Sequence, residues 1–260
     1  MTSFFSTLKS EYIKQKRSTV SSVVILGALF LPAIVLTARL VNASRLPTLY
    51  RTADFWKHLW GMSWESITLI ILPMIVIMVA SLIVQIEYRN NAWKQVHTTP
   101  QSLAAIFFAK QFVILGALLG FFLVLNLGIY AAGILPPLLL PTVPLPHGTI
   151  PFALLAYQNT HYFLDILPIV AVQYLLALHF RNFIVPLGIG LAQWLAVIGC
   201  LSWKYLYIFP YACIALDYVA GNTQRSVARP PVSWEILAVG YYVVITAISF
   251  LLYATKKDRG

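Results

Sequence analysis

The chain has 260 residues, of which 60% are hydrophobic and only 10% are charged. Charged residues make up about a quarter of a soluble domain, so this composition excludes a soluble globular protein. The formal net charge of +10 would suit nucleic-acid binding, but the basic residues lie between apolar stretches, where attraction to anionic lipid headgroups explains them. The sequence therefore predicts an integral membrane protein in contact with lipid, with no nucleic acid as a partner and no sizeable soluble domain.

Residues 1–18 are expected to form an amphipathic helix that lies in the membrane interface. Four apolar side chains share one face of a helical wheel drawn over residues 3–17, with basic side chains on the flanks: Phe4, Phe5, Leu8 and Tyr12. Such a helix lies in the interface plane and does not cross the bilayer. A secretory signal peptide would need an apolar core in this place, which excludes that interpretation.

Six uncharged or nearly uncharged stretches follow, each long enough to cross the hydrocarbon core as a helix. They are residues 20–38, 66–86, 104–135, 161–180, 182–203 and 236–255. A further apolar stretch, residues 205–216, spans only about 12 residues and contains Pro210, so we expect a re-entrant or interfacial helix there. The prediction is an all-α integral membrane protein with six transmembrane helices in residues 19–255 and a short tail, residues 256–260.

The placement of Lys and Arg predicts that both termini lie in the cytoplasm. With this topology, eleven of the 18 basic residues fall on the inner side and seven on the outer side, as the positive-inside rule requires. The tightest basic clusters, at the two termini and in residues 87–100, all lie inside.

Two of the outer connections have a distinctive composition. Residues 39–65 form a polar loop in which Trp56, Trp60 and Trp64 recur at four-residue spacing, as in an aromatic belt at the membrane interface. Residues 136–151 contain six prolines. Because a helix in hydrocarbon cannot extend through so many prolines, we expect an irregular outer cap there.

Motifs for chemistry are sparse. No G-x-x-x-x-G-K-[ST], H-E-x-x-H or C-x-x-C pattern is present, so the sequence predicts neither a phosphate-binding loop nor a catalytic or metal site. The five histidines do not fall at ligand spacing on one helix. Cys200 and Cys213 both fall near the outer side, where they could pair in an oxidising compartment or pack unpaired among apolar side chains.

Asp165 is the one acidic residue inside a predicted span. A charge in a membrane helix is a candidate for an ion or proton route. Alternatively, Asp165 lies within about one turn of the outer end of its helix and reaches the interface. Its lone placement and the nearby His161 favour the second interpretation.

A polar island, residues 87–100, separates the second and third predicted spans. It begins with Glu87, contains Arg89, Trp93 and Lys94, and ends with Pro100. Residues 90–97 would form a short helix along the cytoplasmic face. Such a helix could act as a rigid lever that docks into a groove of a partner, or it could be an ordinary amphipathic connector.

The island pattern E-x-R-x-x-x-W-K-x-x-x-x-x-P resembles the ABC-2 type of ABC-transporter permease, closest to the small six-span branch that includes lantibiotic-protection permeases. The resemblance extends to the interface helix, to a short inner turn at residues 179–182 and to a broken helix before the last span. Two positions depart from it. Asn91-Ala92 stands where many relatives have Gly-Thr, and Gln101-Ser102 stands where a basic residue follows the proline.

The resemblance implies a single permease domain, residues 1–260, in a bacterial cytoplasmic membrane. It implies a separate ABC ATPase subunit that binds the ATP, so that this chain needs no cofactor of its own, and a second permease chain that is identical or related. The island becomes a coupling helix, and the residues expected to contact the ATPase are Glu87, Arg89, Asn90, Asn91, Trp93 and Lys94.

The resulting hypothesis is a permease subunit of an ATP-driven exporter, itself not an enzyme. The scarcity of charge in the spans favours an amphipathic peptide, drug or lipid-like cargo. A secondary transporter with Asp165 as the carrier of a proton or ion is the alternative. A membrane enzyme would need converging catalytic groups that the sequence does not show, and an anchor would not need six spans.

Overall fold

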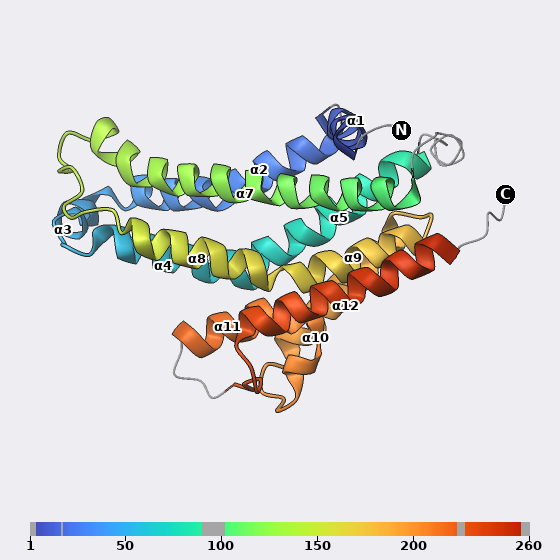
Figure 1. Cartoon of the computed structure of the whole chain (residues 1–260). Coiled ribbons are helices and arrows are strands. Elements are labelled where there is room, and N and C mark those ends of the chain that lie inside the picture. Colours follow the sequence, from blue (N-terminus) through green and yellow to red (C-terminus); the bar gives the residue numbers. More distant parts are fainter. Residues whose placement is uncertain (1–3, 17, 90–101, 223–226, 256–260) are drawn as a thin grey trace.

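The computed structural model describes residues 4–16, 18–89, 102–222 and 227–255. These ranges contain helices and no strand (Figure 1), which confirms the predicted all-α class for them. In chain order the helices are α1 (Phe4–Lys16), α2 (Thr19–Val41), η1 (Ala43–Arg45), α3 (Leu46–Tyr50), α4 (Phe55–Ser66), η2 (Ile67–Ile71), α5 (Leu72–Arg89), α7 (Leu103–Leu139), α8 (Phe152–Asp165), α9 (Leu167–His179), α10 (Ile184–Gly199), η3 (Leu206–Ile208), η4 (Pro210–Ala212), α11 (Cys213–Asn222) and α12 (Trp234–Thr255).

Within the described residues, five helical stretches are long and apolar enough to cross a membrane. They are α2, the continuous stretch from α4 into α5, α7, the stretch from α8 into α9, and α12. The predicted fifth span contains α10, an apolar helix of 16 residues. At 1.5 Å per residue such a helix is about 24 Å long, shorter than the hydrocarbon core of about 30 Å. The sixth crossing therefore stays a prediction.

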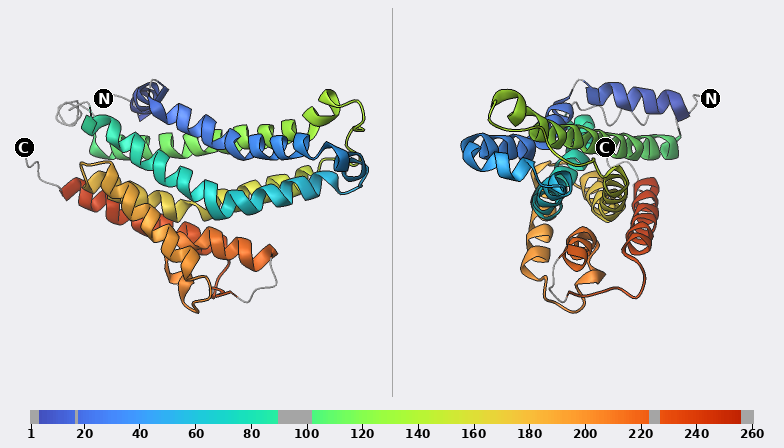
Figure 2. Two further views of the ribbon diagram at one scale, coloured as in Figure 1. Left: turned by 180° about the vertical axis from the view of Figure 1, so that it is seen from behind. Right: turned by 90° about the vertical axis from the view of Figure 1, so that its left-hand side faces the viewer.

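The apolar stretch expected to be re-entrant does not form a spanning helix. It folds into the single 3₁₀ turns η3 and η4 and the first residues of α11. Together with α10 these elements make a short layer beside α9 and α12 that reaches only part of the length of the bundle (Figures 1 and 2).

The predicted aromatic belt is wrong, because Trp56, Trp60 and Trp64 are buried inside the protein. They lie on α4, which a single π-helical turn, η2, joins to α5, so the second span begins well before the predicted boundary. Side chains four residues apart share one face of a helix, and this face packs against α7 and α8. The Trp56 ring stacks on Tyr130 with centroids 5.5 Å apart, and Trp64 lies 4.8 Å from Tyr162.

The proline-rich connection begins later than predicted, because α7 continues through Pro136 and Pro137 to Leu139. A proline in a helix has no N–H for the carbonyl four residues earlier, which for Pro137 is the carbonyl of Gly133. The Tyr50 hydroxyl donates to that carbonyl at 2.9 Å instead. From residue 140 to residue 151 the chain is irregular, as predicted.

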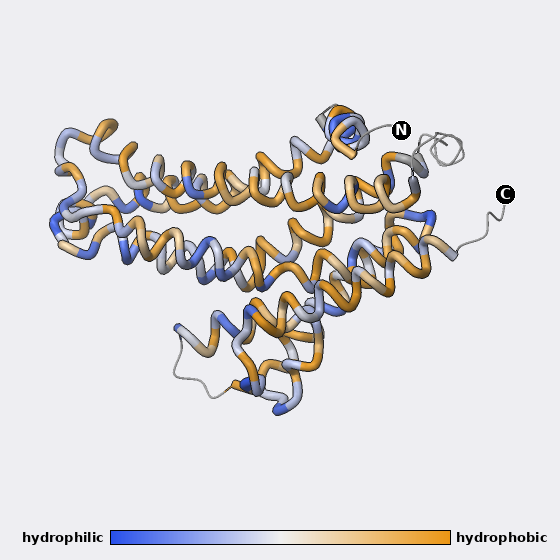
Figure 3. The backbone as a smooth tube through the Cα atoms, in the orientation of Figure 1, coloured by the Kyte–Doolittle hydropathy of each residue, from blue (hydrophilic) through white to orange (hydrophobic). Residues whose placement is uncertain are grey.

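The helix ends that border the polar island gather at one end of the bundle. The end of α5, the start of α7, the end of α9 and the end of α12 all lie there, and α1 lies against α7 and α2 at the same end (Figures 1 and 2). The η1 turn, α3 and the proline-rich connection form the opposite end. Figure 3 shows hydrophobic residues along the long helices and hydrophilic stretches at both ends and in the short layer. Helix α1 and the end of α12 thus lie at the same end of the bundle, while the cytoplasmic assignment of the termini stays a prediction.

Helix α1 presents apolar side chains outward and polar side chains inward. Thr7, Glu11 and Gln15 recur every four residues and are buried against the bundle, whereas Phe5 and Tyr12 are exposed. Exposed apolar side chains at the end of a membrane protein suit contact with lipid. The prediction of a helix is confirmed for Phe4–Lys16, and its place in the membrane interface stays a prediction.

Candidate functional site

The predicted ATPase contacts lie between α5 and α7. Helix α5 ends at Arg89, and α7 begins at Leu103, where the Ser102 hydroxyl accepts a hydrogen bond from the Ala105 backbone N–H at 3.2 Å. Asn90, Asn91, Trp93 and Lys94 fall outside the described residues, as do the side chains of Glu87 and Arg89. The helix predicted over residues 90–97 therefore stays a prediction. The described helices α5 and α7 precede and follow this segment in the chain.

The end of α5 is tied to the turn between α9 and α10. The Tyr88 hydroxyl donates to the Leu178 carbonyl at 3.0 Å, and Gln85 Nε2 donates to the Phe180 carbonyl at 3.3 Å. The turn itself is as short as predicted, since α9 ends at His179 and α10 begins at Ile184. These two hydrogen bonds hold the end of α5 against this turn.

The start of α7 is tied to α1 by a buried ion pair. Lys110 Nζ lies 2.6 Å from a carboxylate oxygen of Glu11, and their side chains are only 2% and 6% exposed. Lys14 binds the other oxygen of Glu11. Burial would raise the pKa of Glu11, but the charges and hydrogen bonds of Lys110 and Lys14 outweigh it, and the pKa lies below its ordinary value of 4.5. Glu11 is therefore ionised at neutral pH and anchors α1 to α7.

A single buried glutamine connects the elements on the other side of α5. Gln173 Nε2, on α9, donates to Ser81 Oγ of α5 at 2.8 Å and to the Pro186 carbonyl of α10 at 2.7 Å. Its Oε1 accepts from the Tyr211 hydroxyl of η4 at 2.8 Å. A Cβ at Gly190 would lie 2.6 Å from this Oε1, so the glycine lets α10 approach the network. These bonds join α5, α9, α10 and η4.

Asp165 is placed differently from its prediction. It is the last of the 14 residues of α8, and its side chain has no exposed surface. The expectation that it lies within about one turn of the outer end of its helix is wrong, because α8 begins at Phe152, nine residues before the predicted span. Its place relative to the membrane interface stays a prediction. Neither carboxylate oxygen of Asp165 has a hydrogen-bond partner in the described structure.

The structure places further polar groups near Asp165 that the sequence did not indicate as neighbours. Asp217 of α11 and Glu235 of α12 are the charged groups that act on it. His161, one turn earlier on α8, lies 3.0 Å from Glu235. The signal available in the sequence was weak, because Asp217 and Glu235 each border an apolar stretch and only tertiary contact places them beside Asp165.

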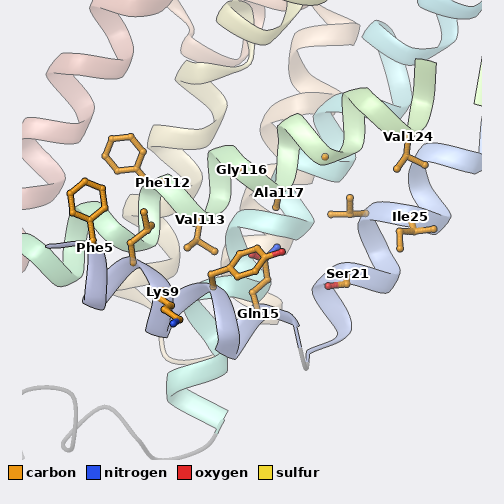
Figure 4. Close-up of a pocket in the computed structure, with 14 residues that line it drawn as sticks. Phe5, Lys9, Gln15, Ser21, Ile25, Phe112, Val113, Gly116, Ala117 and Val124 are labelled. Carbon is orange, nitrogen blue, oxygen red and sulfur yellow. The ribbon is translucent and has the colours of Figure 1, made fainter. Parts of the chain in front are cut away.

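An apolar groove lies between α1, α2 and α7 (Figure 4). Its volume is about 630 Å³. Lys9 and Gln15 of α1 and Ser21 of α2 provide polar atoms, and the remaining lining is mostly apolar. A Cβ at Gly116 or Gly120 would meet no atom within 4 Å, so the α7 wall is open. The groove has the size and chemistry to accommodate an apolar chain with a polar end.

The described residues contain neither a disulfide bond nor a cluster of possible metal ligands. Cys200 and Cys213 are unpaired, the first exposed and the second buried, so of the two alternatives the structure has the unpaired one. Among the residues that the structure describes, no group of three or more His, Cys, Asp or Glu side chains is arranged to bind a metal ion.

Comparison with known families supports the interpretation of this fold. The family described as ABC-2 family transporter protein matches residues 7–199. Searches of curated proteins and of solved structures found no match. The matched range runs from α1 to the end of α10 and includes both attachments of the α5–α7 connection. The chain therefore belongs to the ABC-2 family of membrane transporter proteins.

Proposed function

We propose that this chain is the permease subunit of an ATP-driven exporter and that a separate ABC ATPase docks on residues 87–100. The observation that supports it best is the double attachment of the segment on either side of those residues. Upstream, α5 is bonded to the α9–α10 turn, and downstream, α7 is paired with α1. Family membership supplies the expectation of an ATPase partner.

In this proposal, closure of two ATPase subunits on ATP displaces the α5–α7 connection. The displacement passes through Tyr88 and Gln85 to α9 and α10, and through Lys110 and Glu11 to α1. A second permease chain, identical or related, completes the pathway in a bacterial cytoplasmic membrane. The cargo is an amphipathic peptide, drug or lipid-like molecule, since the spans contain few charged residues.

The experiment is Trp93→Ala in the full chain, co-expressed with an ATPase encoded in a neighbouring reading frame. We expect the variant to insert normally and to lose the co-purified ATPase or its stimulation. Trp203→Ala is the matched control, because Trp203 is an exposed tryptophan after α10. Unchanged ATPase stimulation in the Trp93 variant would contradict the proposal.

The second candidate function is a secondary transporter with Asp165 as the carrier, favoured by the complete burial of that carboxyl group. Transport in whole cells separates the two candidates. An uncoupler should abolish gradient-driven transport and leave ATP-driven transport intact, whereas ATP depletion should do the reverse.

A further inference from the structure

A buried carboxyl group without a partner needs an explanation of its own. The Asp165 side chain is fully buried, and among the described residues both of its oxygens lack a hydrogen-bond partner. An ionised carboxylate in that position would be destabilised by several kcal/mol, because burial removes its hydration and nothing replaces it. Asp165 therefore requires a ligand that supplies either a hydrogen-bond donor or a positive charge.

Another carboxyl group interacts with Asp165. Asp217 of α11 is the charged residue with the largest effect on it, followed by Glu235. Two ionised carboxylates both accept hydrogen bonds and neither donates, and their charges repel. A hydrogen bond between Asp165 and Asp217 can therefore form only when one of them holds a proton. No Lys or Arg of the described ranges acts on Asp165 in place of that proton.

The neighbouring polar groups are all more exposed than Asp165. Asp217 is half-buried, and the side chains of His161 and Glu235 are 19% and 30% exposed. Glu235 is in the first turn of α12, a spanning helix, and so lies near the membrane surface on the side opposite to the α5–α7 connection. Glu235, His161 and Asp217 are therefore candidates for a polar route between that surface and Asp165.

Four further titratable side chains act on this region: three are neutral at physiological pH, and the fourth, Glu65, acts on Tyr218 and not on the pair. They are Tyr162 on α8, Cys213 and Tyr218 on α11, and Glu65 on α4. Burial raises the pKa of the Asp217 carboxyl above its ordinary value, while its interactions with Asp165 and His161 act against this.

We propose that Asp165 and Asp217 together bind one proton, which exchanges with water through His161 and Glu235. A proton from bulk water binds one carboxylate oxygen, and the resulting O–H donates a hydrogen bond to the facing carboxylate. The pair then carries one negative charge instead of two. With the proton bound, a hydrogen bond joins α8 to α11, and without it the two helices repel each other. The site does not depend on the energy source of transport.

The experiment is infrared spectroscopy of the full chain in lipid vesicles at neutral pH, which detects the C=O stretch of a protonated carboxyl group. We expect this band in the native protein, its loss in Asp165→Asn, and its retention in Asp54→Asn, the same change at an exposed acid. A native spectrum without the band, or a band that Asp165→Asn leaves unchanged, would overturn the proposal.

A second variant keeps the test decisive if Asp165→Asn fails to fold. In Asp217→Asn the partner of Asp165 changes from a carboxylate to an amide, so the band should shift. A band at the native frequency would exclude the pairing.

Transfer into D₂O tests the exchange route through His161 and Glu235. The double variant His161→Phe, Glu235→Gln should slow the deuterium-induced shift of the band, and an unchanged rate would exclude the route. Neither measurement involves ATP hydrolysis, so their failure would leave the exporter proposal standing.

Discussion

The attachment of α1 depends on two charged side chains that are almost completely buried. Glu11 and Lys110 lie 99 positions apart in the chain and bond at 2.6 Å. A buried pair gains little over an apolar pair of the same shape, but breaking it leaves an uncompensated charge in a dry site. The ion pair fixes the position of α1 along α7, because shifting α1 by one helical turn would separate Lys110 from the Glu11 carboxylate.

Replacing Lys110 by methionine should therefore destabilise the protein strongly. Leaving Glu11 buried without Lys110 is expected to cost about 3–5 kcal/mol, observed as a lower thermal unfolding midpoint in detergent. Lys14→Met is the control. It removes a cation from the same carboxylate at a side chain that is 36% exposed, so the loss should stay within about 1 kcal/mol. Equal losses in both variants would contradict the assignment of the buried pair.

The same pair predicts a loss of stability in acid. The pKa of Glu11 is lowered in the folded protein, so its contribution to stability is present above the ordinary pKa of 4.5 and is lost as the pH falls below that value. Unfolding midpoints measured from neutral pH downward should show this decline. Glu11→Gln lacks the titrating group and should remove this part of the decline, and a native-like acid profile in that variant would refute the prediction.

Close packing between helices decides where glycine is required along α7. A Cβ at Gly133 would lie 2.6 Å from the buried Trp56 ring, whereas a Cβ at Gly120 would meet no atom within 4 Å. The same element thus contains a glycine that permits a helix contact and another that faces the open groove. The four-residue spacing of tryptophans on α4 explains the first, because these rings fill the space that α7 leaves.

Two alanine substitutions on α7 should consequently have different effects. Gly133→Ala forces the Trp56 ring or the helix to move, and such overpacking costs about 1–3 kcal/mol. Gly120→Ala adds a methyl group to open space and improves helix propensity, so no destabilisation is expected. Thermal unfolding of the two purified variants gives the comparison, and an equal or larger loss in Gly120→Ala would show that the two contacts are misassigned.

For the whole molecule, the described helices connect the two borders of residues 87–100 to different parts of the bundle. The α5 side leads to α9, α10 and η4 through Tyr88, Gln85 and Gln173, and the α7 side leads to α1. In the proposed exporter, a push on the connection would move the short layer against the long helices. The proposal therefore predicts that this coupling can be weakened at the described helices, outside residues 87–100.

Tyr88→Phe should reduce transport per ATP hydrolysed while insertion and ATPase binding stay normal. The variant loses the hydrogen bond to the Leu178 carbonyl, worth about 1 kcal/mol, which corresponds to a decrease of about fivefold. Tyr130→Phe is the control, because Tyr130 lies in the second half of α7, far from the α5–α7 connection. Paired assays of ATP turnover and cargo export in vesicles test this, and full coupling in Tyr88→Phe would refute the mechanical connection.

Sequence reasoning located the membrane helices better than the contacts between them. Uncharged stretches indicate lipid directly, so α2, α7 and α12 lie close to their predicted ranges. The second span was underestimated because Trp56 and its neighbours suggested an interface, although they pack against other helices. The partner of Lys110 was missed because an ion pair across 99 positions leaves no local pattern.

The composition and the uncharged stretches by themselves determined the class of the protein, the approximate position of its long helices and the polar connection between the second and third. These follow from the free energy of placing each side chain in lipid or water, which is a property of the residue. Only the tertiary structure decided that Asp165 is buried beside Asp217, that tryptophans fill the interior and that Glu11 fixes α1. Those outcomes depend on which helix faces meet, and hydropathy along the chain does not specify that.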